Sequence, residues 1–237
     1  MITEGVGLAL IPSNYLTEKQ INIYMANCDF LLAQEISNFC DKPLAKGATS
    51  EAVIINRNDI DFDATTIAAD GSVTSLVLKS SKKGYRCLQP GNKPYGTGNT
   101  TLVVGDFQNT WTHTLPIILL AHDADVTTNI VEVLGKGEFV VVVKMKNTGD
   151  SDTANGRYQI FGFDNGLRAS EQTHTIADDT LGSGWSTTLQ EEGATKPARF
   201  LVGTTAEATE QAYKALLPGN GGGGGGAGDD DDENLGE

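Results

Sequence analysis

The sequence is poor in the residues that most often carry catalysis, metal binding or covalent cross-links. Its 237 residues include only three cysteines and three histidines. Cys28, Cys40 and Cys87 form no C-x-x-C pair, which predicts reduced, buried thiols rather than a disulfide framework or a metal site. No apolar run approaches the roughly 20 residues of a membrane-spanning helix, and no basic stretch typical of a signal peptide precedes the first apolar residues. We therefore expect a protein without a membrane anchor that is made in the cytoplasm.

Positive charge is also scarce, with 17 Lys and Arg against 31 Asp and Glu and a net charge of −14. Six negative charges lie at residues 229–233 and 237, which leaves −8 for the rest of the chain. A nucleic-acid reader needs a basic stripe to neutralise phosphate, so the composition argues against that class. The glycine tract at 221–226 and the acidic run after it bury no apolar surface. We predict a disordered tail over residues 219–237 and a single β-rich domain over residues 1–218.

Familiar catalytic and nucleotide-binding motifs are missing: no HExxH, GxSxG or Walker-type pattern occurs. The three histidines are His113, His122 and His174. His122 lies beside Asp123 and Asp125, but Asp125 is better explained as a helix cap than as a metal ligand. Three carboxylates alternate along one short stretch: Asp59, Asp61 and Asp63. This stretch fits a solvated strand edge or turn and departs from the EF-hand pattern, so we expect no catalytic, cofactor or metal site.

The most regular pattern is a long antiparallel hairpin. Residues 139–143 are an apolar, β-branched run, which favours a strand buried on both faces. The polar, glycine-containing stretch 147–156 predicts a turn, and Tyr158, Ile160 and Phe163 restart the β pattern. This hairpin indicates the core of a β-domain whose strands carry no catalytic group.

Shorter β segments and two helices are expected around this hairpin. The β segments are residues 51–56, 64–78 (a hairpin turning at Asp70-Gly71), 101–104, 111–120, 168–177, 185–191 and 198–202. One short helix is expected at about 125–134, with Asp125 as N-cap and Gly135 just past its end. A C-terminal helix is expected at about 205–217. The order of elements predicts a mainly β protein, an antiparallel β-sandwich or barrel with one short flanking helix and a C-terminal helix.

Residues 79–99 are the most basic part of this acidic chain. Their Gly and Pro residues predict a long loop, and loops of that length are usually functional or disordered. Its candidates for contact with an acidic face of another subunit are Lys79, Lys82, Lys83, Arg86, Lys93 and Tyr95. A solvated loop is the alternative. The apolar stretch 5–11, ended by Pro12, fits a short strand or an arm that packs on a neighbour.

Several short motifs lie between Trp111 and Val202. They are Trp111-Thr-His113-Thr-Leu115, the helix end Leu134-Gly135-Lys136-Gly137, the run 139–143, residues 158–167 in the pattern Y-x-x-x-G-x-D-x-G-L, and residues 184–189. Together they resemble motifs of tail tube and related virion proteins of tailed bacteriophages, especially phages that infect Bacteroidetes. Ser183 here separates two glycines that are adjacent in the family motif. The resemblance covers under half of the chain.

The resemblance implies a β-sandwich whose subunits form homo-oligomeric rings, and these rings stack into a tube that conducts the genome during ejection. It implies contacts with further copies and with other virion tail proteins, no cofactor, and a location in the virion after synthesis in the host cytoplasm. Residues 79–99 would bridge to the next ring. DNA would pass without specific binding, because an acidic face repels phosphate by like charge.

Other interpretations stay open at this point. A head–tail connector, a tail terminator or a capsid-decorating protein would keep the virion but change the position in it. A β-sandwich module that binds carbohydrate or an ion belongs to another class. Such a module would use the three carboxylates of residues 59–63 and aromatic side chains such as Tyr85 and Tyr95.

Overall fold

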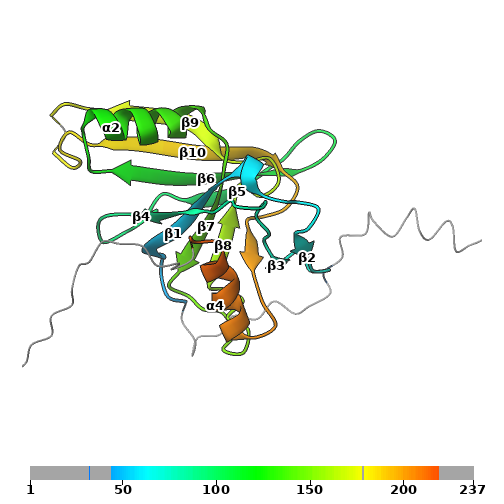
Figure 1. Cartoon of the computed structure of the whole chain (residues 1–237). Coiled ribbons are helices and arrows are strands. Elements are labelled where there is room, and N and C mark those ends of the chain that lie inside the picture. Colours follow the sequence, from blue (N-terminus) through cyan, green and yellow to red (C-terminus); the bar gives the residue numbers. More distant parts are fainter. Residues whose placement is uncertain (1–31, 33–43, 178, 219–237) are drawn as a thin grey trace, which may run out of the picture. The chain divides into compact units, whose positions relative to one another are not determined.

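The computed structural model describes residues 32, 44–177 and 179–218 (Figure 1). By its internal contacts the chain divides at Pro43, and the second unit begins at Leu44. The prediction of a single domain over residues 1–218 stays a prediction for the first 43 residues. The apolar stretch 5–11, Cys28, Cys40 and the predicted tail 219–237 lie outside the described residues.

Two sheets form the second unit, one of seven strands and one of four. The larger sheet is, in spatial order, β2 (Thr66–Ile67), β3 (Val73–Ser75), β11 (Arg199–Leu201), β8 (Tyr158–Phe161), β7 (Phe139–Met145), β1 (Ala48–Asn56) and β4 (Tyr85–Leu88). The smaller sheet is β5 (Asn99–Val103), β6 (Thr110–Leu119), β10 (Trp185–Ala194) and β9 (Arg168–His174). The strands pair antiparallel except β3 and β11, which run parallel. The predicted mainly β class and antiparallel sandwich are confirmed.

Strand β7 lies at the centre and has two buried faces. Val141 and Val143 pack into one core with Leu115 and Leu189 of the smaller sheet. Val140 and Val142 point the other way, into a second core. Each of the four valines is at most 1% exposed, and burial of such a side chain stabilises the fold by about 1.5–3 kcal/mol. The predicted hairpin is also present, because β7 pairs antiparallel with β8.

The second core is covered by the C-terminal helix α4 (Ala206–Ala215). Thr205 caps its first turn by accepting a hydrogen bond from the backbone of Ala208. Tyr213 is 2% exposed, and its ring stacks on Tyr158 of β8 with 4.3 Å between ring centroids. The larger sheet is therefore a middle layer between α4 and the smaller sheet, and the predicted C-terminal helix is confirmed.

A second helix follows β6 and consists of α2 (Ala124–Val126), a π-helical turn η2 (Thr127–Val131) and α3 (Glu132–Lys136). The predicted short helix is thus present, but its N-cap is Asp123 and not Asp125. Asp123 has extended backbone and accepts from the amide of Val126, which places Asp125 inside the first turn, where it accepts from Asn129. No helix among the described residues is long and apolar enough to cross a membrane.

The predicted end of this helix at Gly135 is also wrong, since the helix continues to Lys136 and Gly137 caps it. Gly135 lies inside the helix, where the absence of a side chain lets the helix pack closely on Gln172 of β9. A Cβ atom at Gly135 would lie 2.9 Å from the Gln172 side-chain oxygen. The same amide donates to the carbonyl oxygen of Val131, which leaves this part of the helix firmly attached to the smaller sheet.

The turn after β8 explains the spacing of the Y-x-x-x-G-x-D-x-G-L segment. Gly162 has φ +83°, and a Cβ atom there would lie 2.5 Å from the carbonyl oxygen of Phe139. Asp164 accepts hydrogen bonds from the amide and hydroxyl of Thr195 and pairs with Arg199 at 3.0 Å. The turn thus ties the end of β8 to the segment that leads from β10 to β11.

Candidate functional site

The basic segment 79–99 is not the single long loop that the sequence predicts. Residues Tyr85–Leu88 form β4, which pairs with β1 at the end of the larger sheet. The four residues of β4 lie at the edge of the sheet and pair with β1 through their backbone groups. They do so although Gly and Pro residues interrupt the β pattern on both sides of them. Three of the basic candidates are held by their own chain: Lys79 by the carbonyl oxygen of Asn58 (2.8 Å), Lys82 by Asp59 (3.1 Å) and Arg86 by Glu51 (3.7 Å).

The side chains of Lys83 and Lys93 are exposed and have no hydrogen bond or ion pair within the part of the chain that the structure describes. These two lysines stay candidates for contacts between subunits.

The prediction that Tyr95 contacts another subunit is wrong, because this residue is only 8% exposed and belongs to the core between the two sheets. Its hydroxyl donates to the carbonyl oxygen of Cys87 at 3.2 Å, and burial raises the pKa of this hydroxyl. Tyr95 therefore anchors the turn after β4 instead of presenting an aromatic ring to a partner. Burial also raises the pKa of the Cys87 thiol.

Gln89 is a polar residue whose role the sequence did not reveal. It is 5% exposed, and its side-chain amide bonds to both backbone groups of Ile118 on β6. The Gln89 oxygen accepts from the Ile118 amide at 2.8 Å, and its nitrogen donates to the Ile118 carbonyl at 3.3 Å. The Gln89 side chain thus takes the place of a neighbouring backbone and joins the end of β4 to the smaller sheet.

The three alternating carboxylates do not share a strand face. Residues Arg57–Asp59 form a 3-10 turn, and Asp61 begins the next turn by accepting from the amide of Ala64. A hydrogen bond from Asn56 outweighs burial and lowers the pKa of Asp59, which also pairs with Lys82. Among the described residues, no three His, Cys, Asp or Glu side chains are arranged to hold a metal ion.

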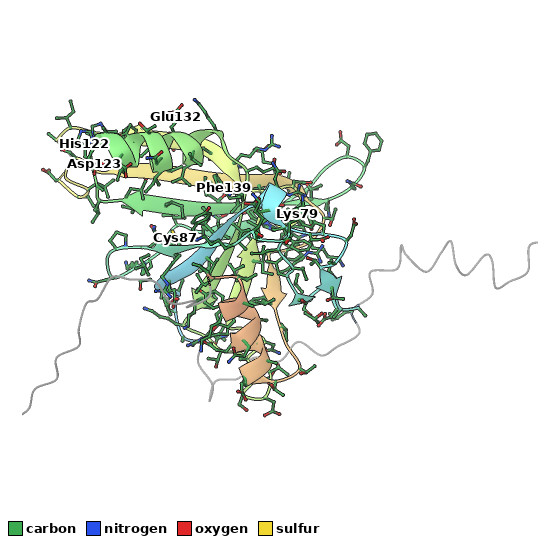
Figure 2. All side chains as sticks on the ribbon, in the orientation of Figure 1. Lys79, Cys87, His122, Asp123, Glu132 and Phe139 are labelled. Atoms are coloured by element: carbon green, nitrogen blue, oxygen red, sulfur yellow. The ribbon has the colours of Figure 1, made fainter. Side chains whose placement is uncertain are left out.

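Two histidines and a tryptophan stack at the start of the helix that follows β6. The rings of His122 and His174 are parallel within 6°, with centroids 4.5 Å apart, and His174 stacks on Trp185 at 4.8 Å. His122 and Asp123 lie at the same helix end in Figure 2, where Asp123 is already used as the cap. This stack holds the end of β9 against the segment that leads into the helix, so its role is structural.

His113 and Glu191 form a buried pair of ionisable side chains. They are 3% and 1% exposed, and the His113 Nδ1 lies 2.6 Å from the Glu191 Oε2. Glu191 also accepts hydrogen bonds from the backbone amides of Gly162 and Asn165. A carboxylate that orients a histidine is also found in catalytic sites, but this pair is enclosed in the core. It connects the smaller sheet to the turn after β8.

An apolar groove opens between the helix that follows β6 and the edge strand β4. We use "apolar groove" for a hollow of about 520 Å³ whose lining includes Tyr85, Leu88, Ile117, Leu119, Ile130 and Val133. Cys87 and Phe139, both labelled in Figure 2, also line it. Leu88 and Val133 are 63% and 47% exposed, and Arg86 is the only charged residue of the lining. Ile130 and Val133 of the helix are 41% and 47% exposed and line this groove.

A second apolar surface lies in the hairpin between β5 and β6. We call residues 102–107 the β5–β6 tip; Leu102, Val103, Val104 and Phe107 are exposed, and Phe107 is fully so. The sequence predicted a strand here but not that its apolar side chains would face solvent. The signal was present in Val103-Val104-Gly105-Asp106-Phe107, where apolar residues surround a turn-forming Gly-Asp pair.

Comparison of the chain with models of protein families, with curated proteins and with solved structures finds no match in any of the three.

Proposed function

We propose that the protein is a structural subunit of a phage virion, a tail tube subunit that assembles into stacked homo-oligomeric rings and performs no catalysis. The observation that carries this proposal is the exposure of apolar side chains on two separate surfaces, the apolar groove and the β5–β6 tip. Extended apolar patches on a protein surface mark sites of association. The motifs between Trp111 and Val202 direct the proposal to tail tube proteins.

Open sheet edges give further support. Strand β4 ends the larger sheet, and β5 and β9 flank the smaller one, so these three strands have an outer edge without a strand partner among the described residues. Such edges offer backbone donors and acceptors for pairing with another chain. A closed ring would satisfy them by repeating the same contact around its circumference.

The charge of the protein suits a DNA conduit. Without the six acidic residues of its tail the chain still carries −8, and like charge keeps phosphate from adhering to a wall. In this proposal DNA passes without specific binding, and the partners are further copies and other virion tail proteins.

Light scattering of the purified protein over a range of concentrations tests the proposal. We expect a mass that is a fixed multiple of the 25.1 kDa subunit and then larger species as rings stack. A fixed multiple that never grows indicates a connector or terminator ring. A monomer of 25.1 kDa at all concentrations contradicts the proposal.

The exposed lysines supply a test of stacking. Reversing Lys83 and Lys93 to Glu should leave single rings intact and prevent their stacking, because both side chains are free to meet an acidic face of the next ring. The control is Lys196→Glu, which changes an exposed lysine outside this segment. Unchanged stacking in the double variant would remove these lysines from the interface.

A further inference from the structure

We propose that the β5–β6 tip of one copy inserts into the apolar groove of the next copy, with Phe107 as the anchor. The resulting contact runs head to tail through the assembly. This inference rests on the proposed function, since it names the contact through which a ring would form.

The β5–β6 tip has the properties of a preformed insertion element. Its base is fixed by pairing of β5 and β6, in which Leu102 lies opposite Trp111 and Val103 opposite Thr110. Gly105 allows a tight turn, because a Cβ atom there would lie 2.5 Å from the Gln108 carbonyl oxygen. Phe107 is 102% exposed, although an aromatic ring of its size can bury about 150–250 Å². The tip therefore presents a large apolar anchor on an ordered support.

The apolar groove has the complementary properties. Its floor is formed by Ile117 and Leu119, and Ile130, Val133 and Leu88 form walls whose apolar surface is partly open to solvent. Its volume of about 520 Å³ accommodates a Phe ring together with aliphatic neighbours. A ring that enters such a pocket is the kind of buried aromatic anchor that dominates interface energies.

The charges of the two surfaces match as well. Asp106 is the only charged residue in the hairpin from Asn99 to Thr110, and Arg86 is the only charged residue that lines the groove. Arg86 is held loosely, at 3.7 Å from Glu51, and its side chain is 60% exposed. It can therefore pair with an incoming carboxylate, so charge complementarity favours the β5–β6 tip as the occupant.

The fold keeps the tip away from the groove of its own copy. Both surfaces are attached to β6: the tip precedes Thr110, and the groove floor lies at Ile117 and Leu119. Seven residues of strand separate Thr110 from Ile117 and nine separate it from Leu119, which is about 23–30 Å. The contact must be made with a second copy, and one patch meeting a different patch generates a ring when the rotation closes and a filament when it does not.

Sedimentation velocity of three full-length variants tests this contact. Phe107→Ser removes the anchor at a fully exposed position, and Val133→Glu places a carboxylate in the groove wall. Each should weaken self-association at least about 30-fold, whereas the control Ile176→Ser, at an 82% exposed position outside both surfaces, should behave as wild type. Circular dichroism checks that Val133→Glu is folded.

Mixing the two defective chains gives the sharpest readout. The Phe107→Ser chain keeps its groove and the Val133→Glu chain keeps its tip, so an equal mixture should form dimers and nothing larger. In a second experiment, Arg86→Asp and Asp106→Arg should each weaken assembly, and the chain that carries both should recover it.

The opposite results separate the two proposals. If wild type assembles and Phe107→Ser assembles equally well, the head-to-tail contact is wrong and the proposed function stands. If Leu8→Ser disrupts assembly while Phe107→Ser does not, the β5–β6 tip is not the anchor and the head-to-tail contact is wrong. A wild-type monomer refutes both the contact and the proposed function.

Discussion

Glu191 gives the strongest test of how the two sheets are held together. Its carboxylate is 1% exposed and accepts hydrogen bonds from three groups, the His113 ring and the backbone amides of Gly162 and Asn165. Two of these partners belong to the turn after β8 of the larger sheet, and His113 belongs to the smaller sheet. Glu191→Ala would leave these three donors without this acceptor, and two of them, the His113 ring and the Gly162 amide, are buried.

The magnitude follows from these contacts. A buried donor left without an acceptor costs about 1–3 kcal/mol, and removing one member of a buried polar pair costs about 3–5 kcal/mol. We therefore expect Glu191→Ala to lower the free energy of unfolding by about 3–5 kcal/mol. Glu191→Gln keeps one acceptor oxygen and should cost about 2 kcal/mol.

Urea unfolding followed by tryptophan fluorescence and circular dichroism measures this loss. Glu192→Ala is the matched control, because Glu192 is the exposed neighbour on the same strand and should change stability by less than about 0.5 kcal/mol. A double-mutant cycle with His113→Ala should show strong non-additivity. A Glu191→Ala protein within about 0.5 kcal/mol of wild type would refute the view that this network joins the sheets.

Three further predictions concern the turn after β8 and the end of β4. Burial raises the pKa of Asp164, but hydrogen bonds from Thr195 and Arg199 outweigh it, so the pKa is lowered on folding. The stability that Asp164 provides is therefore complete above roughly pH 4 and is lost as pH falls through the lowered pKa. In that pH range the urea midpoint of Asp164→Asn should vary less with pH than the midpoint of the wild type. Gly162→Ala should lower the free energy of unfolding by more than about 2 kcal/mol, because the new Cβ would lie 2.5 Å from the Phe139 carbonyl oxygen. The control is Gly47→Ala, since Gly47 has a similar φ of +88° but open space around it. Thermal melting should therefore show a smaller loss of stability for Gly47→Ala. Gln89→Ala should lower the free energy of unfolding by about 1–3 kcal/mol in urea titrations, because it leaves both backbone groups of Ile118 without their side-chain partner.

The sequence predicted the fold best where local pattern and burial agree. The β-branched run at residues 139–143 has two buried faces, so every side chain in it is apolar. The strand can therefore be predicted without any tertiary information. The hairpin that turns at Asp70-Gly71 was predicted from its turn residues, since Gly71 has φ +89°, a conformation that glycine adopts readily.

Predictions failed where contacts distant in sequence decide the outcome. Gly135 is of the residue type that often follows a helix end, yet it lies inside the helix, where the chain packs against Gln172. Tyr95 lies in a segment rich in turn residues, and its burial results from packing in the core with residues such as Leu115 and Val143. The apolar groove combines residues of β4, β6 and the helix after it, so no local pattern could have indicated it.

Negative-stain electron microscopy of the purified wild-type protein beside Phe107→Ser tests the central claim of self-assembly most directly. We expect rings that stack into tubes in wild type and isolated particles in the variant. Wild-type fields that contain only single subunits, at concentrations where light scattering also gives a monomer, would contradict the account.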